Sequence, residues 1–357
     1  MNNELLIGNT LVGLQHPPYF IADVGANHDG ELERAFRLIE LAKQAGAHAA
    51  KFQNFKANKI VSKFGFENLG GKSTHQANWK KSVFETYEDA SISTDWTPLL
   101  KKKCDEVGIE YFTSPYDKES VDHVDPYVRV YKIGSGDITW PQIIEHIASK
   151  GKPVLLATGA SSFADVERAM SILMKKGATV ALLQCNTNYT LDNDKFKFVN
   201  INVLKQFRDK FPGIVLGLSD HTLGHATVAG SIALGARVIE KHFTDDNGRT
   251  GPDHKFAMNP TTWREMVDVS NEIFYALGNG VKRIEDNEVE SRIVQQRSLR
   301  VTKDYPKGAV LESEFIEALR PCPDDALRPY EIDTCVGKKL TVSLKAGEHI
   351  THKSLEV

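Results

Sequence analysis

Short apolar runs rich in β-branched and aromatic residues alternate with longer segments of helical periodicity through most of this chain. Eight such runs can be counted, and they begin at Tyr19, Ala49, Glu110, Val128, Pro153, Thr179, Ile214 and Arg237. Repeated strand–helix units imply a parallel sheet covered by helices, and closing that sheet gives a (β/α)8 TIM barrel. An open, doubly wound sheet is the alternative.

The pattern changes near residue 280. Residues 281–296 are charged and polar and indicate a linker with some helical character. Residues 297–357 contain two passages of similar order, each a short strand-like run, a turn containing Lys and Gly, and a short apolar run. We therefore expect a barrel domain over residues 1–280, the linker, and a small β-rich domain over residues 297–357 that gains stability by packing against a barrel.

The connection after the second expected strand is unusually long. Residues 56–94 are polar and rich in Gly and Lys, which predicts an elaborated connection rather than a simple loop. In a barrel, a connection that follows a strand lies at the catalytic face.

Composition excludes two classes of partner. The formal net charge of −3 gives no sign of the clustered basic surface that phosphate neutralisation requires, so we expect no nucleic-acid partner. No apolar run approaches the roughly 20 residues of a membrane-spanning helix, and the N-terminal residues lack the features of a signal peptide. We expect a cytoplasmic protein without a membrane partner. The four cysteines lack CxxC spacing and are expected to be reduced thiols in packing roles.

Polar side chains gather at the C-terminal ends of the expected strands, where a barrel enzyme has its active site. In chain order they include Asp23, Lys51, Gln53, Ser114, Lys132, Ser135, Asp137, Thr187, Tyr189, Ser219, His221, Glu240 and His242. The sequence predicts that these side chains converge on one site.

Two of these residues indicate an anionic substrate. Lys51 and Lys132 lie at the ends of buried-looking strands among Gly, Ser and Thr residues, a composition suited to holding a phosphate or carboxylate. A lone strand lysine is more often a solvated edge residue, but burying two cations requires partners.

His221 and His242 end successive strands, so one divalent metal ion with open coordination positions could bind between them. Two satisfied core histidines are the alternative. Histidine and oxygen ligands suit manganese, magnesium or zinc equally.

After the eighth strand, the turn GPDH carries Asp253 and His254, which either contact substrate at the catalytic mouth or form a surface turn.

The chain resembles the sialic acid synthase family, also called N-acylneuraminate or nonulosonic acid synthases, along nearly its whole length. The stretches that carry the resemblance are ADVGANHDG, AGAHAAKFQ, FTSPYD, YKIGSGD, LATGAS, GLSDHT, IEKHFT and GPDHKFAMNP. The C-terminal segment, with RSLRVTKDYPKGAVL, is similar to the antifreeze-like (SAF) domain of that family.

The resemblance implies a metal-dependent, C–C bond-forming transferase that condenses phosphoenolpyruvate with an open-chain amino-sugar aldehyde to a nine-carbon 2-keto acid. It implies Mn²⁺ or Mg²⁺ at His221 and His242, with catalytic roles for Asp23 and Asp137. Phosphoenolpyruvate contacts are implied for Lys51, Ser114, Lys132, Ser135, Thr187 and Ser219. Sugar contacts are implied for Gln53, Tyr189, Glu240, Asp253 and Arg320. It further implies a domain-swapped homodimer in which Arg320 reaches the partner's site.

The sequence departs from the family pattern at three places. Asp23 and Asp137 stand where the family has glutamates, and RPCPDD replaces an RPG motif followed by a Gly-rich loop. The shorter carboxylates imply an altered acceptor pocket. Two other functions stay open: a synthase that acts on a phosphorylated sugar, and a catalytically silent binding protein.

Overall fold

The computed structural model describes residues 4–69, 76, 79–189, 191 and 193–356. The chain forms two compact units, Met1–Gly278 and Asn279–Val357, and each has its own apolar core. Within the described residues, no helix is long and apolar enough to cross a membrane.

The first unit is a barrel of eight parallel strands, so the expected TIM-barrel architecture is confirmed. The order β5-β4-β3-β10-β9-β8-β7-β6 is closed where β5 and β6 lie side by side. The strands are β3 (Tyr19–Asp23), β4 (Ala49–Asn54), β5 (Glu110–Pro115), β6 (Tyr131–Ile133), β7 (Val154–Ala157), β8 (Val180–Cys185), β9 (Val215–Asp220) and β10 (Ala236–His242). β6 starts later than the apolar pattern predicts because a 3-10 turn and a bend occupy residues 125–130.

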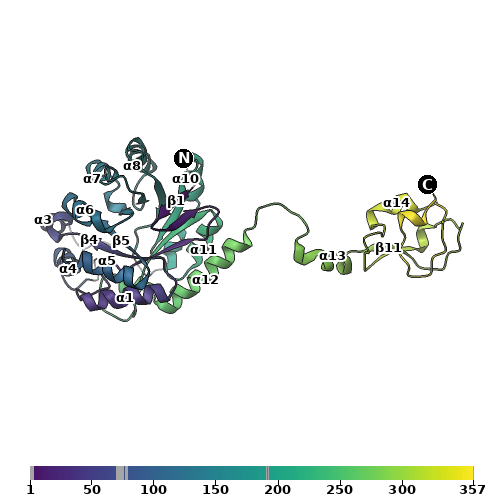
Figure 1. The fold of residues 1–357 in the computed structure, drawn as a ribbon, viewed down its shortest axis with the longest axis horizontal. Helices are drawn as coiled ribbons and strands as arrows, with labels where there is room; N and C mark the ends of the chain where they lie inside the picture. Colours follow the sequence, from purple (N-terminus) through teal and green to yellow (C-terminus); the bar gives the residue numbers. More distant parts are fainter. Residues whose placement is uncertain (1–3, 70–75, 77–78, 190, 192, 357) are drawn as a thin grey trace. The chain divides into compact units, whose positions relative to one another are not determined.

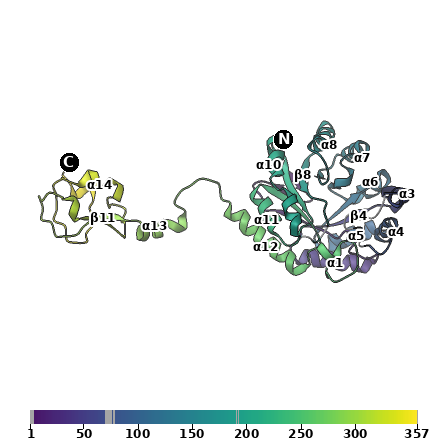
Figure 2. The ribbon, with the colours of Figure 1, turned by 180° about the vertical axis from the view of Figure 1, so that it is seen from behind.

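Eight helices surround these strands and bury one apolar face each against them (Figure 1). The second view shows the same ring from behind (Figure 2). The helices are α1 (Leu32–Gln44), α5 (Trp96–Val107), α6 (Lys118–Val124), α7 (Pro141–Ala148), α8 (Phe163–Lys175), α10 (Val203–Lys210), α11 (Ala226–Ala233) and α12 (Pro260–Ala276). In α1, for example, Ala35, Leu38 and Ile39 are fully buried at helical spacing.

Alternation along each strand separates an inner face from an outer face. An inner apolar cluster contains Ile21, Ala49, Phe112, Val130 and Val238. The next inner residue of each strand lies two positions later, in the layer nearer the C-terminal ends. Those residues are Asp23, Lys51, Ser114, Lys132 and Glu240. The barrel core is therefore apolar toward the N-terminal ends of the strands and polar at the mouth formed by their C-terminal ends.

Three features elaborate the barrel. The long connection after β4 contains α2 (Ala57–Ile60), α3 (Lys63–Glu67) and α4 (Val83–Ala90), while residues 70–75 and 77–78 lie outside the described residues. A hairpin of β1 (Glu4–Ile7) and β2 (Thr10–Gly13), which the sequence did not predict, adds Leu5, Ile7 and Val12 to the inner apolar cluster. A short helix, α9 (Phe196–Val199), precedes α10.

The regular elements of the second unit are α13 (Val289–Gln295), β11 (Ser298–Val301), β12 (Ile316–Leu319) and α14 (Ile332–Cys335). Its regular strands are fewer than the sequence suggests, and single bridges connect much of the rest. Tyr305 and Leu344 exchange two backbone hydrogen bonds of 2.8 and 2.9 Å. A turn follows each of these two bridging residues, and Gly308 and Gly347 take a positive φ in those turns.

Candidate active site

A buried network of ion pairs occupies the inner layer at the barrel mouth. Lys51 Nζ lies 2.6 Å from Asp23 Oδ2, and Lys132 Nζ donates to Glu240 Oε1 at 2.8 Å. Lys51 Nζ is also 3.9 Å from Glu240 Oε1, and Ser219 Oγ donates to the same oxygen at 3.0 Å. All five side chains are at most 5% exposed. The structure thus joins residues from five strands into one cluster, as the strand-end pattern predicted.

Neighbouring charges favour the ionised forms of Glu240 and Lys51. Burial opposes ionisation of Glu240, but the ammonium groups of Lys132 and Lys51 outweigh that effect and lower the pKa of Glu240. Burial likewise opposes the charge of Lys51, and Asp23 and Glu240 raise the pKa of Lys51 above its usual range. An ammonium group has three N–H donors, and Glu240 is the only hydrogen-bond partner of Lys132 among the described residues. Donors are therefore left for a ligand.

Three buried polar atoms around this network have no hydrogen-bond partner in the described part of the chain: Glu240 Oε2, Ser114 Oγ and His242 Nδ1. Unpaired buried polar atoms are rare in folded proteins because each loses its hydration without compensation. Their gathering at the mouth of the barrel indicates a place suited to a polar ligand.

His221 and His242 form an aromatic cluster beside the ion pairs. Their ring centroids are 5.4 Å apart, Tyr189 contacts the His221 ring edge-on at 4.4 Å, and Phe256 lies 5.0 Å from His242. His221 Nδ1 lies 3.0 Å from the Asn186 carbonyl oxygen. Because a carbonyl only accepts, Nδ1 carries the proton and Nε2 keeps its lone pair. Burial, followed by the neighbouring His242, lowers the pKa of His221 to about 3.

This pair fits a divalent metal ion. A metal ligand must be a neutral imidazole, which the pKa of His221 provides, and His242 Nδ1 is one of the unpaired buried atoms. Within the described residues, no group of three or more His, Cys, Asp or Glu side chains could complete a coordination shell. Two histidines leave positions open for water or substrate, as catalytic sites do.

Ser135 and Thr187 meet around Gly159, which follows β7. Ser135 Oγ accepts a hydrogen bond of 2.9 Å from the Gly159 N–H. A Cβ atom at Gly159 would lie 2.5 Å from Thr187 and 2.9 Å from Ser135 Oγ, so only glycine allows this approach. The Cys185 Sγ would be 3.0 Å from the same atom. Cys185 therefore belongs to the site, whereas its sequence context predicted packing alone; its inner position at the end of β8 is the signal that identifies it.

Gln53 and Asp137 lie at the rim of the polar layer. Gln53 is paired in register with Ser114 on the neighbouring strand and is partly exposed. Asp137 lies in the 3-10 turn Ser135–Asp137 that follows β6, and burial raises its pKa to about 6.

Tyr87 on α4 is a neighbour that the sequence did not single out: burial, then the charges of Asp253 and Asp137, raise its pKa. The elaborated connection therefore reaches the mouth.

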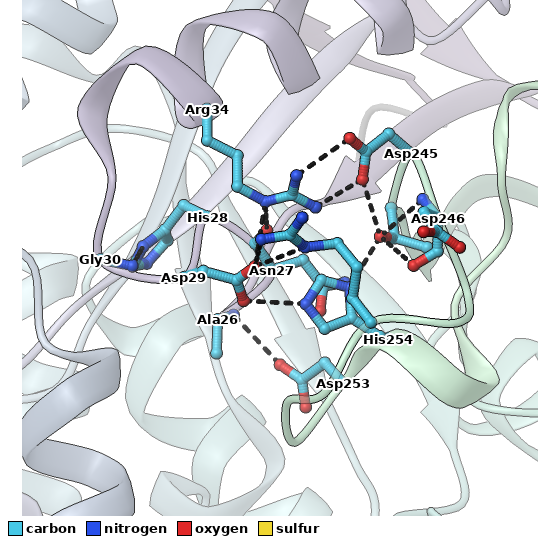
Figure 3. A network of polar contacts seen from close by, with 12 residues as sticks. Ala26, Asn27, His28, Asp29, Gly30, Arg34, Asp245, Asp246, Asp253 and His254 are labelled. Atoms are coloured by element: carbon cyan, nitrogen blue, oxygen red, sulfur yellow. Dashed lines mark hydrogen bonds and ion pairs between the residues drawn. The ribbon is translucent and has the colours of Figure 1, made fainter.

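Asp253 is held over the mouth by the connection after β3. Its Oδ2 atom accepts a hydrogen bond of 3.1 Å from the Ala26 N–H and lies 3.7 Å from His242 Nδ1. Figure 3 shows Asp253 and Ala26 approaching each other from two different loops. The structure places Asp253 of the GPDH turn next to His242 and the connection after β3.

A second polar network ties the same two loops together (Figure 3). Asp29 accepts from Arg249 Nε at 2.8 Å and lies 2.9 Å from His254 Nε2. Arg34 bonds to Asp245 with two nitrogens and lies 3.2 Å from Asp29 Oδ2. Both ring nitrogens of the buried His254 are bonded, Nδ1 to Thr244 Oγ1 at 2.8 Å and Nε2 to Asp29, so this side chain supports the loop. Sequence reasoning missed these partners because they lie more than 200 positions apart.

Arg320 is the predicted site residue that lies in the second unit. It follows β12 directly and is exposed. The other predicted residues all belong to the first unit and lie at the C-terminal ends of its strands or in the connections after them.

Comparison with known proteins decides the family. The model of the NeuB family matches residues 38–282, and the model of the SAF domain matches residues 296–356. The chain belongs to the NeuB family. Its second unit is an SAF domain. The resemblance read from the sequence motifs is thereby confirmed.

Individual relatives of this NeuB-family chain agree. It is 32% identical to the N,N'-diacetyllegionaminic acid synthase of Legionella pneumophila, over 95% of this chain and 94% of that protein. It is 30% identical to the N-acetylneuraminate-9-phosphate synthase of Homo sapiens, over 97% and 94%. The solved N-acetylneuraminic acid synthetase of Leptospira borgpetersenii superposes with a TM-score of 0.71 at 28% identity, covering 82% of this chain and 95% of that one.

Gly25 in this NeuB-family chain permits the approach of Asp253 to His242. Its φ is +50°, and a Cβ atom there would lie 2.7 Å from Asp253 Oδ2 and 3.2 Å from the His242 ring. We expect Gly25→Ala to lower the free energy of unfolding by about 1–3 kcal/mol, because it adds backbone strain and a clash. Urea denaturation measures the change. Gly136→Ala, where no atom lies within 4 Å, is the control, and equal stability of the two variants would contradict this geometry.

The raised pKa of Asp137 predicts a dependence of stability on pH. An aspartate in the unfolded chain titrates near about 3.9, whereas burial raises the pKa of Asp137 to about 6. The folded state therefore binds the proton more tightly, and the free energy of unfolding contributed by Asp137 decreases as the pH rises between these values. Between roughly pH 3.5 and pH 7, Asp137→Asn should gain about 2 kcal/mol relative to the wild type. A difference between the two proteins that stays constant in urea denaturation across this range would refute the assignment.

Proposed function

We propose that this protein condenses phosphoenolpyruvate with an open-chain amino-sugar aldehyde of the N-acetylmannosamine type, giving a nine-carbon 2-keto sugar acid and phosphate. The observation that carries the proposal is the inner layer, in which two buried lysines with unused donors lie beside the unpaired atoms of Ser114, Glu240 and His242. Legionaminic, pseudaminic and neuraminic acid synthases among the relatives support this reaction class.

Phosphoenolpyruvate is placed in the polar layer. Lys51 and Lys132 attract its phosphate and carboxylate, and hydroxyl groups supply short hydrogen bonds. The hydroxyl donors are Ser114, Ser135, Thr187 and Ser219. Because Lys51 is paired with Asp23 and Lys132 with Glu240, the anion shares each ammonium group with a carboxylate.

The acceptor sugar is placed above this layer, nearer the loops. Gln53, Tyr189, Glu240 and Asp253 offer it hydroxyl-binding groups. In the reaction, C3 of phosphoenolpyruvate forms a bond to the aldehyde carbon, and the aldehyde oxygen takes up a proton. Water adds to C2 and releases a proton, and the C2–O bond then breaks to expel inorganic phosphate and leave the ketone. Asp23 and Asp137 are the carboxyl groups assigned to these proton transfers.

His221 and His242 would hold a divalent ion, Mn²⁺ or Mg²⁺. When bound, such an ion supplies Lewis acidity toward the aldehyde oxygen. The tautomer fixed by the Asn186 carbonyl keeps His221 Nε2 free to coordinate, and the buried surroundings of both rings limit access of bulk water.

The test is release of phosphate from phosphoenolpyruvate by metal-replete protein, with a panel of free and phosphorylated amino sugars and mass analysis of the product. We expect release with a free sugar and a matching nine-carbon keto acid. A phosphorylated acceptor is the second candidate, favoured by the N-acetylneuraminate-9-phosphate synthase relatives, and release with phosphorylated sugars alone selects it. No release with any sugar rejects the proposal and favours a silent binding protein, which need not contain a stoichiometric metal ion.

Arg320 is proposed to contact the N-acyl group of the sugar in the partner protomer of a domain-swapped homodimer. Arg320→Ala should raise the KM for the sugar about tenfold and change kcat little, because such a contact binds ground state and transition state alike. Mixing Arg320→Ala with an inactive His242→Ala variant should restore part of the activity if the residues come from different protomers. An unchanged KM for the sugar would reject the role.

A further inference from the structure

Asp220 and Lys241 form a buried ion pair that the proposed reaction does not use. They face each other in the register of β9 and β10, one position before His221 and His242. Because side chains alternate along a strand, they point to the outer face of the barrel while the histidines point inward. The exposed fractions of the two side chains are 2% and 1%.

Both members of the pair take part in several hydrogen bonds. Lys241 Nζ donates to Asp220 Oδ2 at 2.5 Å and to the Thr222 carbonyl at 2.7 Å. Asp220 also accepts from the Thr222 N–H at 3.0 Å, from Thr222 Oγ1 at 2.8 Å and from Thr227 Oγ1 at 2.7 Å. Thr227 lies in the first turn of α11, so the network fixes the end of β9, the end of β10 and α11 to one another.

The network holds the backbone on both sides of His221. Thr222 follows His221 and is bonded through its N–H, its hydroxyl and its carbonyl to the pair. On the other side, Lys195 Nζ donates to the His221 carbonyl at 2.6 Å. The backbone at His221 is thus held from outside the barrel, and His242 is tied to the network through Lys241, the residue before it in β10. The two rings lie 5.4 Å apart.

We propose that Asp220 and Lys241 are positioning residues for the metal site, acting through the backbones of His221 and His242. The inference rests on the proposed metal role of the histidines. A pair of opposite charges also adds no net charge behind the ion, so its effect on metal affinity comes from placement of the ligands. Supporting groups behind metal ligands commonly change affinity by about 10–100-fold when they are removed.

Two substitutions separate placement from charge. Asp220→Asn leaves a buried cation near the site, and Lys241→Met leaves a buried anion. If charge alone mattered, Lys241→Met would bind a dication more tightly than the wild type and Asp220→Asn more weakly. Placement predicts that both variants bind more weakly, by about tenfold or more.

The experiment is a titration of the full chain with Mn²⁺, without substrates. Electron paramagnetic resonance measures the concentration of free Mn²⁺ at each step. Thr227→Val removes one hydrogen bond while keeping both charges, and we expect it to weaken binding about two- to fivefold. Asp125→Asn is the matched control, since Asp125 pairs with Lys152 at 2.7 Å before β7, at the opposite end of the barrel strands. Its Mn²⁺ affinity should equal that of the wild type.

Weaker Mn²⁺ binding by both ion-pair variants, with unchanged affinity in the control, supports the inference. Tighter binding by Lys241→Met, or wild-type affinity in both, overturns it while leaving the proposed function intact. If neither ion-pair variant folds, Thr227→Val decides, and unchanged affinity there overturns the inference. Absence of Mn²⁺ binding by the wild type instead removes the proposed metal site and this inference with it.

Discussion

Replacing His242 with alanine is expected to reduce turnover by at least about 10³-fold while leaving the barrel folded. His242 supplies one of the two imidazoles of the proposed metal site, and its Nδ1 has no hydrogen-bond partner among the described residues, so the substitution breaks no internal hydrogen bond at that atom. Phosphate release measures turnover, and circular dichroism checks the fold.

His146→Ala is the control for this prediction. His146 lies on α7, outside the barrel mouth, and pairs with Asp122 of α6 at 2.8 Å. The side chain of His146 is 26% exposed. We expect that variant to keep wild-type turnover. Wild-type turnover in His242→Ala would remove His242 from the metal site.

Replacing Lys132 with methionine is expected to have the largest combined effect on stability and activity. Glu240 would lose its hydrogen-bonded ammonium group at 2.8 Å and stay buried, with Ser219 as its remaining donor and Lys51 at 3.9 Å as the nearest remaining cation. An uncompensated buried charge lowers the free energy of unfolding by about 3–5 kcal/mol. The loss of a phosphoenolpyruvate ligand should lower kcat/KM for that substrate by at least about 10²-fold. Urea denaturation and initial-rate kinetics measure the two effects.

The double variant Lys132→Met/Glu240→Gln separates these effects. Because it removes both charges, we expect most of the stability to return, while activity stays low. Lys152→Met, at the more exposed pair with Asp125, should cost less than about 1 kcal/mol and leave activity unchanged. An unchanged KM for phosphoenolpyruvate in Lys132→Met would contradict the role assigned to this lysine.

The barrel and its polar mouth could be predicted from the sequence because both follow from short-range patterns. Parallel strands place their C-terminal ends together, so Asp23, Lys51, Lys132 and Glu240 could be grouped without knowledge of any contact. Alternation within each strand then selects the inner residues. The same rule identifies Cys185, which had been assigned to packing on its spacing from other cysteines alone.

Other features depend on contacts that no local pattern contains. Asp29 meets Arg249 and His254 across more than 200 residues, and both partners lie in irregular connections. Asp220 precedes His221 in sequence, which suggests a place in the same site, yet it points to the opposite face of β9. Its partners Lys241 and Thr227 lie on β10 and α11, so the network it forms is not contained in the sequence of β9. The β1–β2 hairpin was missed because its four-residue strands are too short for a strong periodic pattern.

The SAF domain shows a different limit. Its two turns with Lys and Gly could be identified, but its strands β11 and β12 have four residues each and single bridges replace longer ladders. Stability in such a unit comes from a small buried cluster that includes Leu299, Tyr305 and Leu340, which no periodic pattern specifies.

The most direct test of the central claim is the fate of ¹⁸O placed at the oxygen that bridges C2 and phosphorus in phosphoenolpyruvate. Metal-replete protein would be incubated with this substrate and the amino-sugar panel, and the products analysed by mass spectrometry. The account predicts a nine-carbon keto acid without the label and phosphate that carries it, because water supplies the new oxygen at C2 and the C2–O bond breaks. Label retained in the keto acid, or the absence of any nine-carbon product, would contradict the account.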